Sequence, residues 1–269
     1  MAEARAKEEF TRGLGSVSYR IARSLAHVGK GFYFSSAVLF KLTSTPFRFR
    51  RILREAYDQG VASLPVILST SAVTGMVLTL QLVITLTRFG ATMKTPQVLA
   101  LALVRELGPV LAALMFVGKA GGRMASELGT MSVNDQIKAL RVMAIDPMNY
   151  LIVNRVIAGT IAVPLLVTIF DLMGIGAGGI MMYFQENVTF RLFMQQIAEV
   201  LSLRDLLGGW IKGVVFGVVV TLVCCYKGFT AKGGSAGVGQ ATTEAVATAS
   251  IFVIVVNLLL TRFNMIFID

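Results

Sequence analysis

The stretch that decides the fold is residues 61–87, VASLPVILSTSAVTGMVLTLQLVITLT, which holds no charged side chain in 27 residues. A helix needs roughly 20 mainly apolar residues to cross the hydrocarbon core of a bilayer. Charged side chains end at Asp58 on one side of this stretch and resume at Arg88 on the other. We therefore expect a membrane-spanning helix here, with Pro65 near its start.

Four further stretches repeat this pattern: residues 97–118, 156–185, 206–226 and 245–261. Of the 269 residues, 55% are hydrophobic and 15% are charged, whereas a soluble domain carries about 25% charged residues. Hydrophobicity this high excludes disorder, and two adjacent cysteines exclude a disulfide-stapled secreted domain. The sequence predicts an all-α polytopic membrane protein with five membrane-spanning helices.

A basic region precedes the first span. Apolar residues recur at helical spacing from Leu14 to Phe32, and a basic, aromatic segment follows as far as Arg54. A basic amphipathic helix tends to lie in the bilayer interface, although packing on a soluble partner is an alternative. We expect an interfacial region over residues 1–60 and the five-span domain over residues 61–269.

The distribution of positive charge predicts the orientation in the membrane. Five spans place the two termini on opposite sides. If the N-terminus is cytoplasmic, 18 of the 25 Lys and Arg residues fall in cytoplasmic segments. Cytoplasmic segments are enriched in these residues. We therefore expect a cytoplasmic N-terminus and a C-terminus on the outer side. The net charge of +10 is better explained by contact of the cytoplasmic segments with anionic lipid than by binding of nucleic acid.

Four charged residues fall inside the predicted spans. Arg105 and Glu106 lie mid-span, just before Gly108-Pro109, where the proline should kink the helix. Charges at this depth usually face a protein interior or a water-filled cavity. Two interpretations stay open: the pair lines a cavity, or it binds another helix. The same two interpretations apply to Lys212, and a third is that it extends to the membrane surface; we assign no role to Asp171.

The polar segment at 119–155, between the second and third spans, predicts a short helix. Ser132-Val-Asn-Asp135 has the spacing of a capping box, and Asp146-Pro147 should end the helix, which gives bounds of about 132–145. One face of this helix is apolar: Val133, Ile137, Leu140 and Ala144. A helix of this kind docks on a soluble partner or lies flat on the bilayer, and the periodicity does not choose between them.

Several motifs have the spacing of nucleotide-binding or catalytic sites, but their context argues against both functions. Residues 174–179 match G-x-G-x-x-G within a helical stretch, which favours close helix packing over dinucleotide binding. Residues 233–237 match G-x-S-x-G, but the only histidine is the distant His27, so a tight turn is the better interpretation. One histidine and two cysteines do not form an ordinary zinc site. We expect no catalytic residue and no metal site.

Two other patterns bear on packing and on energy supply. Gly209, Gly213 and Gly217 form a face of small residues, for internal packing or for a subunit interface. No P-loop motif occurs in the sequence. If the protein acts in ATP-driven transport, another subunit must therefore supply the nucleotide site.

Three motifs in order resemble the MlaE family of ABC-transporter permeases. The first is RELGPVLAAL at 105–114, with Gly121 to Arg123 and the ELGTM of 127–131. The second is DQIKALRVMAIDP at 135–147. The third is SAGVGQATT at 235–243, followed by Ala245 and Val246. The resemblance runs from about residue 50 to the C-terminus, and the five spans and basic N-terminal helix are consistent with it.

The resemblance implies a permease subunit, not an enzyme, in the inner membrane of a bacterium. Such a permease is a homodimer that moves phospholipid between the inner and outer membranes. A separate cytoplasmic ABC ATPase subunit uses ATP and Mg²⁺, so this chain would hold no cofactor. A hexamer of MCE-domain proteins lies on the outer side, which is the periplasm, and a STAS-domain subunit is a further possible partner. No nucleic acid is involved.

The resemblance also implies functional residues. The lipid cavity at the homodimer interface would be lined by Leu78, Gln81, Thr85, Phe89, Arg105 and Glu106. The helix at 132–145 would be the coupling helix that contacts the ATPase, with Glu127, Asp135, Gln136, Ile137, Leu140 and Asp146. The residues themselves leave one alternative open, a stand-alone secondary transporter or channel that uses the mid-span charges.

Overall fold

The computed structural model describes residues 29–42 and 49–267 and divides the chain into two units, Met1–Thr45 and Pro46–Asp269. The described part of the first unit is one helix over residues 29–42. The earlier part of the interfacial helix expected from residue 14 lies outside the described residues, as does the segment 43–48. The second unit contains all the predicted spans.

Five helical stretches are long and apolar enough to cross a membrane: Phe49–Thr87, Thr92–Val133, Met148–Glu186, Leu203–Phe229 and Gly234–Asn264. Each contains one of the five predicted spans, and the described residues form helices without any strand. The prediction of an all-α, five-span membrane protein is confirmed.

The first span consists of α2 (Phe49–Gly60), η1 (Val61–Ser63) and α3 (Leu64–Thr87). The second consists of η2 (Thr92–Lys94), α4 (Thr95–Ala102), η3 (Leu103–Leu107), α5 (Gly108–Phe116), η4 (Val117–Gly121) and α6 (Gly122–Val133). A short α7 (Gln136–Val142) leads to the third span, η5 (Met148–Val153) and α8 (Asn154–Glu186). α9 (Phe190–Val200), α10 (Leu203–Phe229) and α11 (Gly234–Phe267) complete the chain.

The helices extend well beyond the apolar stretches that predicted them. The second span has 42 residues, which is about 60 Å of helix against a hydrocarbon core of about 30 Å. Our expectation of a polar loop from residue 119 is therefore wrong as far as Val133. The extra turns are stabilised by packing, because Met124, Ala125 and Leu128 of α6 are buried and α6 packs on α10 and α11.

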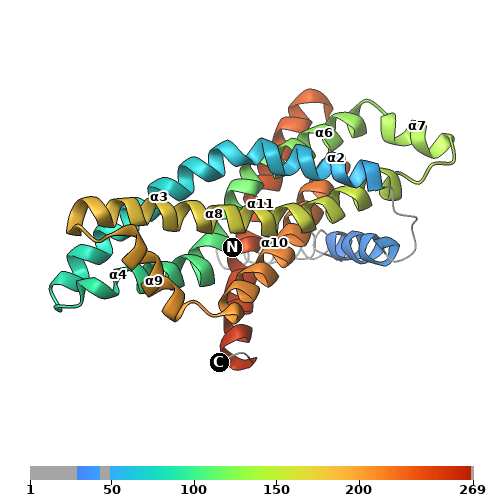
Figure 1. The fold of residues 1–269 in the computed structure, drawn as a ribbon. Helices are drawn as coiled ribbons and strands as arrows, with labels where there is room; N and C mark the ends of the chain where they lie inside the picture. Colours follow the sequence, from blue (N-terminus) through green and yellow to red (C-terminus); the bar gives the residue numbers. More distant parts are fainter. Residues whose placement is uncertain (1–28, 43–48, 268–269) are drawn as a thin grey trace, which may run out of the picture. The chain divides into compact units, whose positions relative to one another are not determined.

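Glycines bring the long helices close together. In Figure 1, α3 runs beside α8, and α10 packs on α8 and α11. A Cβ on Gly75 of α3 would lie 2.0 Å from the Gly174 carbonyl oxygen of α8, and a Cβ on Gly217 of α10 would lie 2.4 Å from that of Gly159. The glycine motif at 174–179 therefore packs helices, as predicted. Gly213 also faces inward, toward Pro164, so the glycine face of α10 serves internal packing.

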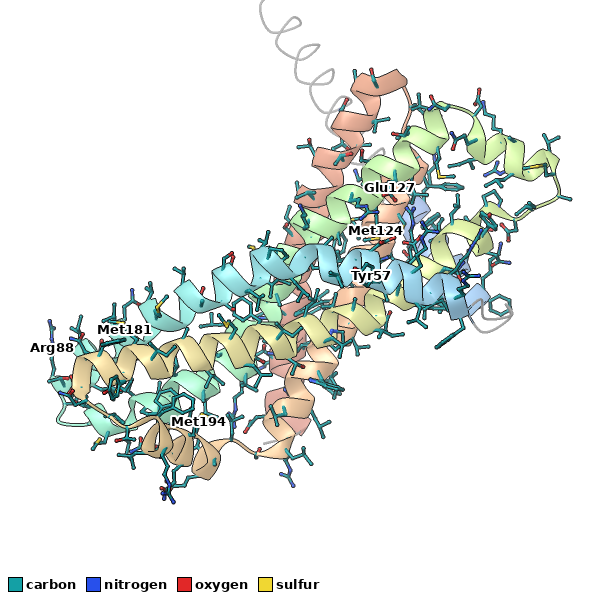
Figure 2. The ribbon with its side chains drawn as sticks, turned by 45° about the horizontal axis from the view of Figure 1, so that its top comes forward. Tyr57, Arg88, Met124, Glu127, Met181 and Met194 are labelled. Carbon is teal, nitrogen blue, oxygen red and sulfur yellow. The ribbon has the colours of Figure 1, made fainter. Side chains whose placement is uncertain are left out.

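The two ends of the bundle carry different elements (Figure 2). Arg88, after α3, lies at the same end as Met181 of α8 and Met194 of α9, whereas Tyr57 of α2 and Glu127 of α6 lie at the other. α7 belongs to this second end, near the turn between α10 and α11. Positive φ angles at Gly233 and Gly234 confirm that turn. Both cysteines are fully buried in α10.

Candidate functional site

The second span is interrupted one turn before Pro109. Residues Leu103–Leu107 form the π-turn η3, and the Gly108 amide donates to the Leu103 carbonyl. Because proline has no N–H, Pro109 cannot donate to the Arg105 carbonyl, as residue 109 of a regular α-helix would. Lys212 of α10 replaces that donor, with its Nζ 2.8 Å from the Arg105 carbonyl oxygen. An irregular turn thus lies where the sequence predicted a kink.

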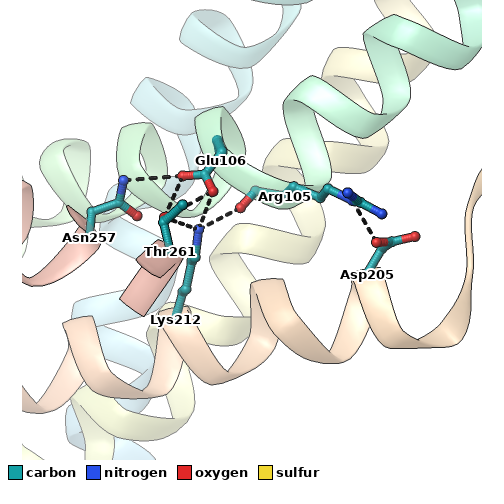
Figure 3. Close-up of polar contacts among 6 residues, drawn as sticks. All are labelled: Arg105, Glu106, Asp205, Lys212, Asn257 and Thr261. Atoms are coloured by element: carbon teal, nitrogen blue, oxygen red, sulfur yellow. Dashed lines mark hydrogen bonds and ion pairs between the residues drawn. The ribbon is translucent and has the colours of Figure 1, made fainter. Parts of the chain in front are cut away.

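Lys212 is also the centre of a polar cluster formed by three helices (Figure 3). Its Nζ lies 2.7 Å from Oε1 of Glu106 and 2.9 Å from Oγ1 of Thr261. From α11, Thr261 and Asn257 donate to the Glu106 carboxylate at 2.9 and 3.2 Å. The ammonium's three donors thus have three acceptors inside the protein. Lys212 is 2% exposed, so of the interpretations left open for it, binding to other helices is correct and extension to the membrane surface is excluded.

Arg105 bonds to the start of α10. Its Nε donates to Oδ1 of Asp205 at 2.7 Å. Ser202 holds Asp205 in a capping box, because the Ser202 amide and hydroxyl both donate to Oδ2. Neighbouring residues on a helix are about 100° apart, which explains why Arg105 and Glu106 have different partners. The sequence analysis missed Asp205, although Ser202 and Asp205 have the spacing of a capping box.

These charged groups line a cavity of about 390 Å³. Its lining comes from the second span, α10 and α11: Val98, Leu101, Ala102, Arg105, Glu106, Arg204, Asp205, Gly208, Gly209, Thr261 and Asn264. The side chains of Arg105 and Glu106 stay 49% and 40% exposed, so both remain accessible from the cavity. Small-molecule sites are typically apolar hollows of about 300–1,000 Å³ with a few polar groups. The lining is suited to an amphipathic ligand.

The other four predicted cavity residues lie elsewhere. Leu78, Gln81 and Thr85 are on α3, and Phe89 is in the turn after it. Gln81, Thr85 and Phe89 are exposed, with Phe89 at 79%, and Leu78 is half-buried. None of the four lines the cavity beside Arg105. They share an exposed surface of the first span instead, and their proposed role stays a prediction.

The helix predicted at 132–145 is present as the shorter α7, Gln136–Val142, and it begins differently. Ser132 is still in α6, and its Oγ lies 3.2 Å from the carbonyl oxygens of Phe229 and Ala231. Asp135 precedes α7 with a left-handed φ of 57° and caps no backbone amide. The prediction of a capping box at Ser132 is therefore wrong, because α6 continues through that serine.

The predicted coupling residues fall into two groups. Asp135 and Gln136 are exposed, and Asp146 accepts from the Met148 amide at 3.1 Å, at the start of η5. Three others contact the rest of the protein: Glu127 bonds to arginines on α6 and α8, Ile137 is buried, and Leu140 is half-buried. The most exposed apolar residues near the end of α7 are two that the sequence analysis did not select, Val142 at 88% and Met143 at 60%.

Asp171 of α8 is buried beside the break in the second span. It is 8% exposed, and its Oδ1 has no hydrogen-bond partner among the residues that the structure describes. A Cβ on Gly108 would lie 1.8 Å from that oxygen, so any other residue here would displace the Asp171 carboxylate. In the described part of the chain, no group of His, Cys, Asp or Glu could hold a metal ion. Asp171 thus belongs neither to the cluster around Lys212 nor to the lining of the cavity.

Comparison with known proteins agrees with these features. The family model described as Permease MlaE matches residues 52–263. A protein of Rickettsia bellii, named probable ABC transporter permease protein, is 35% identical over 92% of this chain and 95% of its own length. The intermembrane phospholipid transport system permease protein MlaE of Haemophilus influenzae is 36% identical over 79% of this chain and 82% of its own. The chain therefore belongs to the MlaE permease family.

Proposed function

We propose that this chain forms the membrane pathway of an ATP-driven transporter that moves phospholipid between the inner and outer membranes. The observation that carries this proposal is the cavity, whose wall combines apolar side chains with the ion pairs of Arg105 and Glu106. A phospholipid needs both kinds of surface, because its acyl chains favour apolar contact and its head group needs polar partners. The name of the Haemophilus influenzae relative is consistent with this cargo.

A second copy of the chain would complete the pathway. The exposed face of α3 carries the predicted lining residues Gln81 and Thr85 among exposed apolar neighbours such as Val77 and Ile84. Exposed apolar surface of this kind packs against lipid or against another protein. In a homodimer, two such faces would enclose the space into which a lipid leaves the cavity.

The energy would come from a separate ATPase, which uses ATP and Mg²⁺ and docks on α7. The sequence holds no P-loop, and α7 lies between the second and third spans at the end opposite the cavity. The exposed Val142 and Met143 offer an apolar contact there. MCE-domain proteins on the outer side, and a STAS-domain subunit on the ATPase, are the further partners that we propose.

Five apolar helices and the family place the chain in the inner membrane as a multi-pass protein. We propose that its N-terminus is cytoplasmic and its C-terminus periplasmic, because 18 of the 25 Lys and Arg residues then fall in cytoplasmic segments. With this orientation α7 is cytoplasmic, within reach of an ATPase. The cavity then opens toward the periplasm, because Val98 and Arg204 lie just after the outer ends of their helices.

The experiment is ATP-dependent transfer of a fluorescent phospholipid by the complex of this chain with its ATPase and MCE-domain subunits, reconstituted in proteoliposomes. Two variants change the cavity in different ways: Glu106→Ala removes a polar partner, and Val98→Trp fills the space. Two controls change exposed residues outside its lining, Glu199→Ala on α9 and Ile180→Trp on α8.

We expect both cavity variants to assemble and to transfer lipid more slowly, with both controls at the wild-type rate. Unchanged transfer by both cavity variants would refute the role of the cavity. Lipid flux that needs no ATPase would favour the stand-alone transporter instead.

A further inference from the structure

A second network of charged residues, centred on a buried arginine, lies at the end of the bundle next to α7. Its centre is Arg155, the second residue of α8, whose side chain is 7% exposed. Nη2 of Arg155 lies 2.9 Å from Oε2 of Glu127 on α6, and Nη1 lies 3.5 Å from the Met124 carbonyl oxygen. Nε lies 3.5 Å from Oε1 of Glu55 on α2. One guanidinium thus joins α2, α6 and α8.

Two further contacts, from the same face of α2 as Glu55, hold α2 against the third span. Gln59 is 3% exposed, and its Nε2 donates to the Arg155 carbonyl at 3.4 Å. Arg51 donates to the hydroxyl of Tyr150, and its guanidinium carbon lies 3.8 Å from the centre of that ring. Residues 51, 55 and 59 are four apart, so they share one face of α2. The whole of that face is bound to η5 and α8.

Glu127 connects the network to α7. Its Oε1 accepts from Nε of Arg123 at 2.7 Å, while its Oε2 accepts from Arg155. Glu127 lies in the middle of α6, which ends at Val133, and α7 begins at Gln136. Two residues separate these helices, so a displacement of α7 acts directly on the end of α6. The carboxylate of Glu127 joins α6 to Arg155, so it would carry such a displacement to α8 and α2.

The guanidinium suits such a joint. Its planar fork of donors fixes the direction of the Glu127 carboxylate, which accepts a hydrogen bond from Nη2, whereas Glu55 is held by an ion pair without a hydrogen bond to Nε. With Glu55 and Glu127 both bound, Arg155 fixes the spacing of α2 and α6. A lysine would keep the charge but lose the fork, because an ammonium is a point charge on a flexible stem.

We propose that Arg155 is the joint that passes movement of α6 and α7 to α2, and so to α3 in the same span, during the transport cycle. The proposal rests on the proposed function, because it needs an ATPase that acts on α7. α2 runs through η1 into α3 without a break, so a shift of α2 moves the face of α3 that carries Gln81. Arg155 and Glu127 act as positioning residues, and neither touches lipid or nucleotide.

The test measures ATP hydrolysis and phospholipid transfer together on the complete reconstituted complex. Glu55→Gln breaks the joint on the side of α2, and Asp58→Asn is its matched control. Asp58 is on the same helix and lines the same small hollow, but forms no ion pair among the described residues. We expect Glu55→Gln to hydrolyse ATP at the wild-type rate and to move about fivefold less lipid per ATP, the lower end of typical coupling between sites. Asp58→Asn should match the wild type in both.

Arg155→Lys separates coupling from folding, because it keeps the buried charge and loses only the fork. We expect a melting temperature near that of the wild type, with less lipid moved per ATP. The proposal is overturned if both Glu55→Gln and Arg155→Lys keep the wild-type ratio. It is also overturned if melting temperature, hydrolysis and transfer fall in parallel, since that marks a purely structural role. A wild-type complex that hydrolyses ATP and moves no lipid would refute the proposed function instead.

Discussion

Lys212→Met tests the polar cluster most directly, because methionine keeps the apolar stem and deletes the ammonium. Breaking a buried ion pair usually costs about 3–5 kcal/mol of stability. For this pair we expect a cost of about 2 kcal/mol, because Glu106 is 40% exposed and keeps its hydrogen bonds to α11. The Arg105 carbonyl also loses its donor, which Pro109 cannot replace, for about 1 kcal/mol more. We expect the free energy of unfolding to fall by about 3 kcal/mol in total.

The assay is denaturant or thermal unfolding of the purified protein in mild detergent. Lys227→Met is the matched control: Lys227 is on the same helix and pairs with Glu244 at 2.8 Å, but the two side chains are 28% and 48% exposed. Such a pair contributes about 0–1 kcal/mol. Adding Glu106→Gln to Lys212→Met should recover about 1 kcal/mol, because the unpaired charge is then gone. Equal losses for Lys212→Met and Lys227→Met would refute the reasoning.

Three further changes test other parts of the structure. Gly217→Ala places a Cβ 2.4 Å from a carbonyl oxygen of α8 and should lower the free energy of unfolding by about 1–3 kcal/mol. Gly176 has open space around it, so Gly176→Ala should raise the free energy of unfolding by up to about 1 kcal/mol. Equal melting temperatures for these two variants would contradict the close packing of α8 and α10. Ser202→Ala removes the cap of α10 and should cost about 1 kcal/mol in thermal unfolding; no loss would show that the cap is dispensable. Val142→Asp should leave the melting temperature unchanged and weaken co-purification of the ATPase, while Leu140→Asp, half-buried, should lower the melting temperature. Full ATPase recovery with Val142→Asp would exclude that side chain from the contact.

The membrane fold follows from the uncharged stretches, but the ends of the helices do not. Hydropathy reports which residues lie in the hydrocarbon core, and a helix stops only where its packing and caps end. Residues 119–133 are polar enough to form a loop in water. They nevertheless continue the helix, because the buried Met124 and Leu128 belong to α6, which packs on α10 and α11. The same packing explains the false capping box, since Ser132 bonds to Phe229 and Ala231 at the end of α10.

The sequence predicts the charged residues of the second span in the candidate site, but not which residues they bind. Arg105 and Glu106 stand out because charge is rare inside a span. Their partners Asp205 and Thr261 lie about 100 and 155 residues away, so only the packing of α10 and α11 against the second span shows that these residues pair with Arg105 and Glu106. The capping-box spacing at Ser202 was a usable signal for Asp205. No local pattern marks Arg155, because its two carboxylates come from α2 and α6.

The burial of both cysteines has a practical consequence. Cys224 and Cys225 are the only thiols in the chain, and both are fully buried. Reagents that alkylate thiols need access to the sulfur, so the folded natural chain should not react with them. A cysteine introduced at Phe89 or at Val142, both highly exposed, would then be the one reactive thiol at its end of the bundle. An impermeant maleimide added to intact cells can thus tell the two sides of the membrane apart without replacement of either native cysteine.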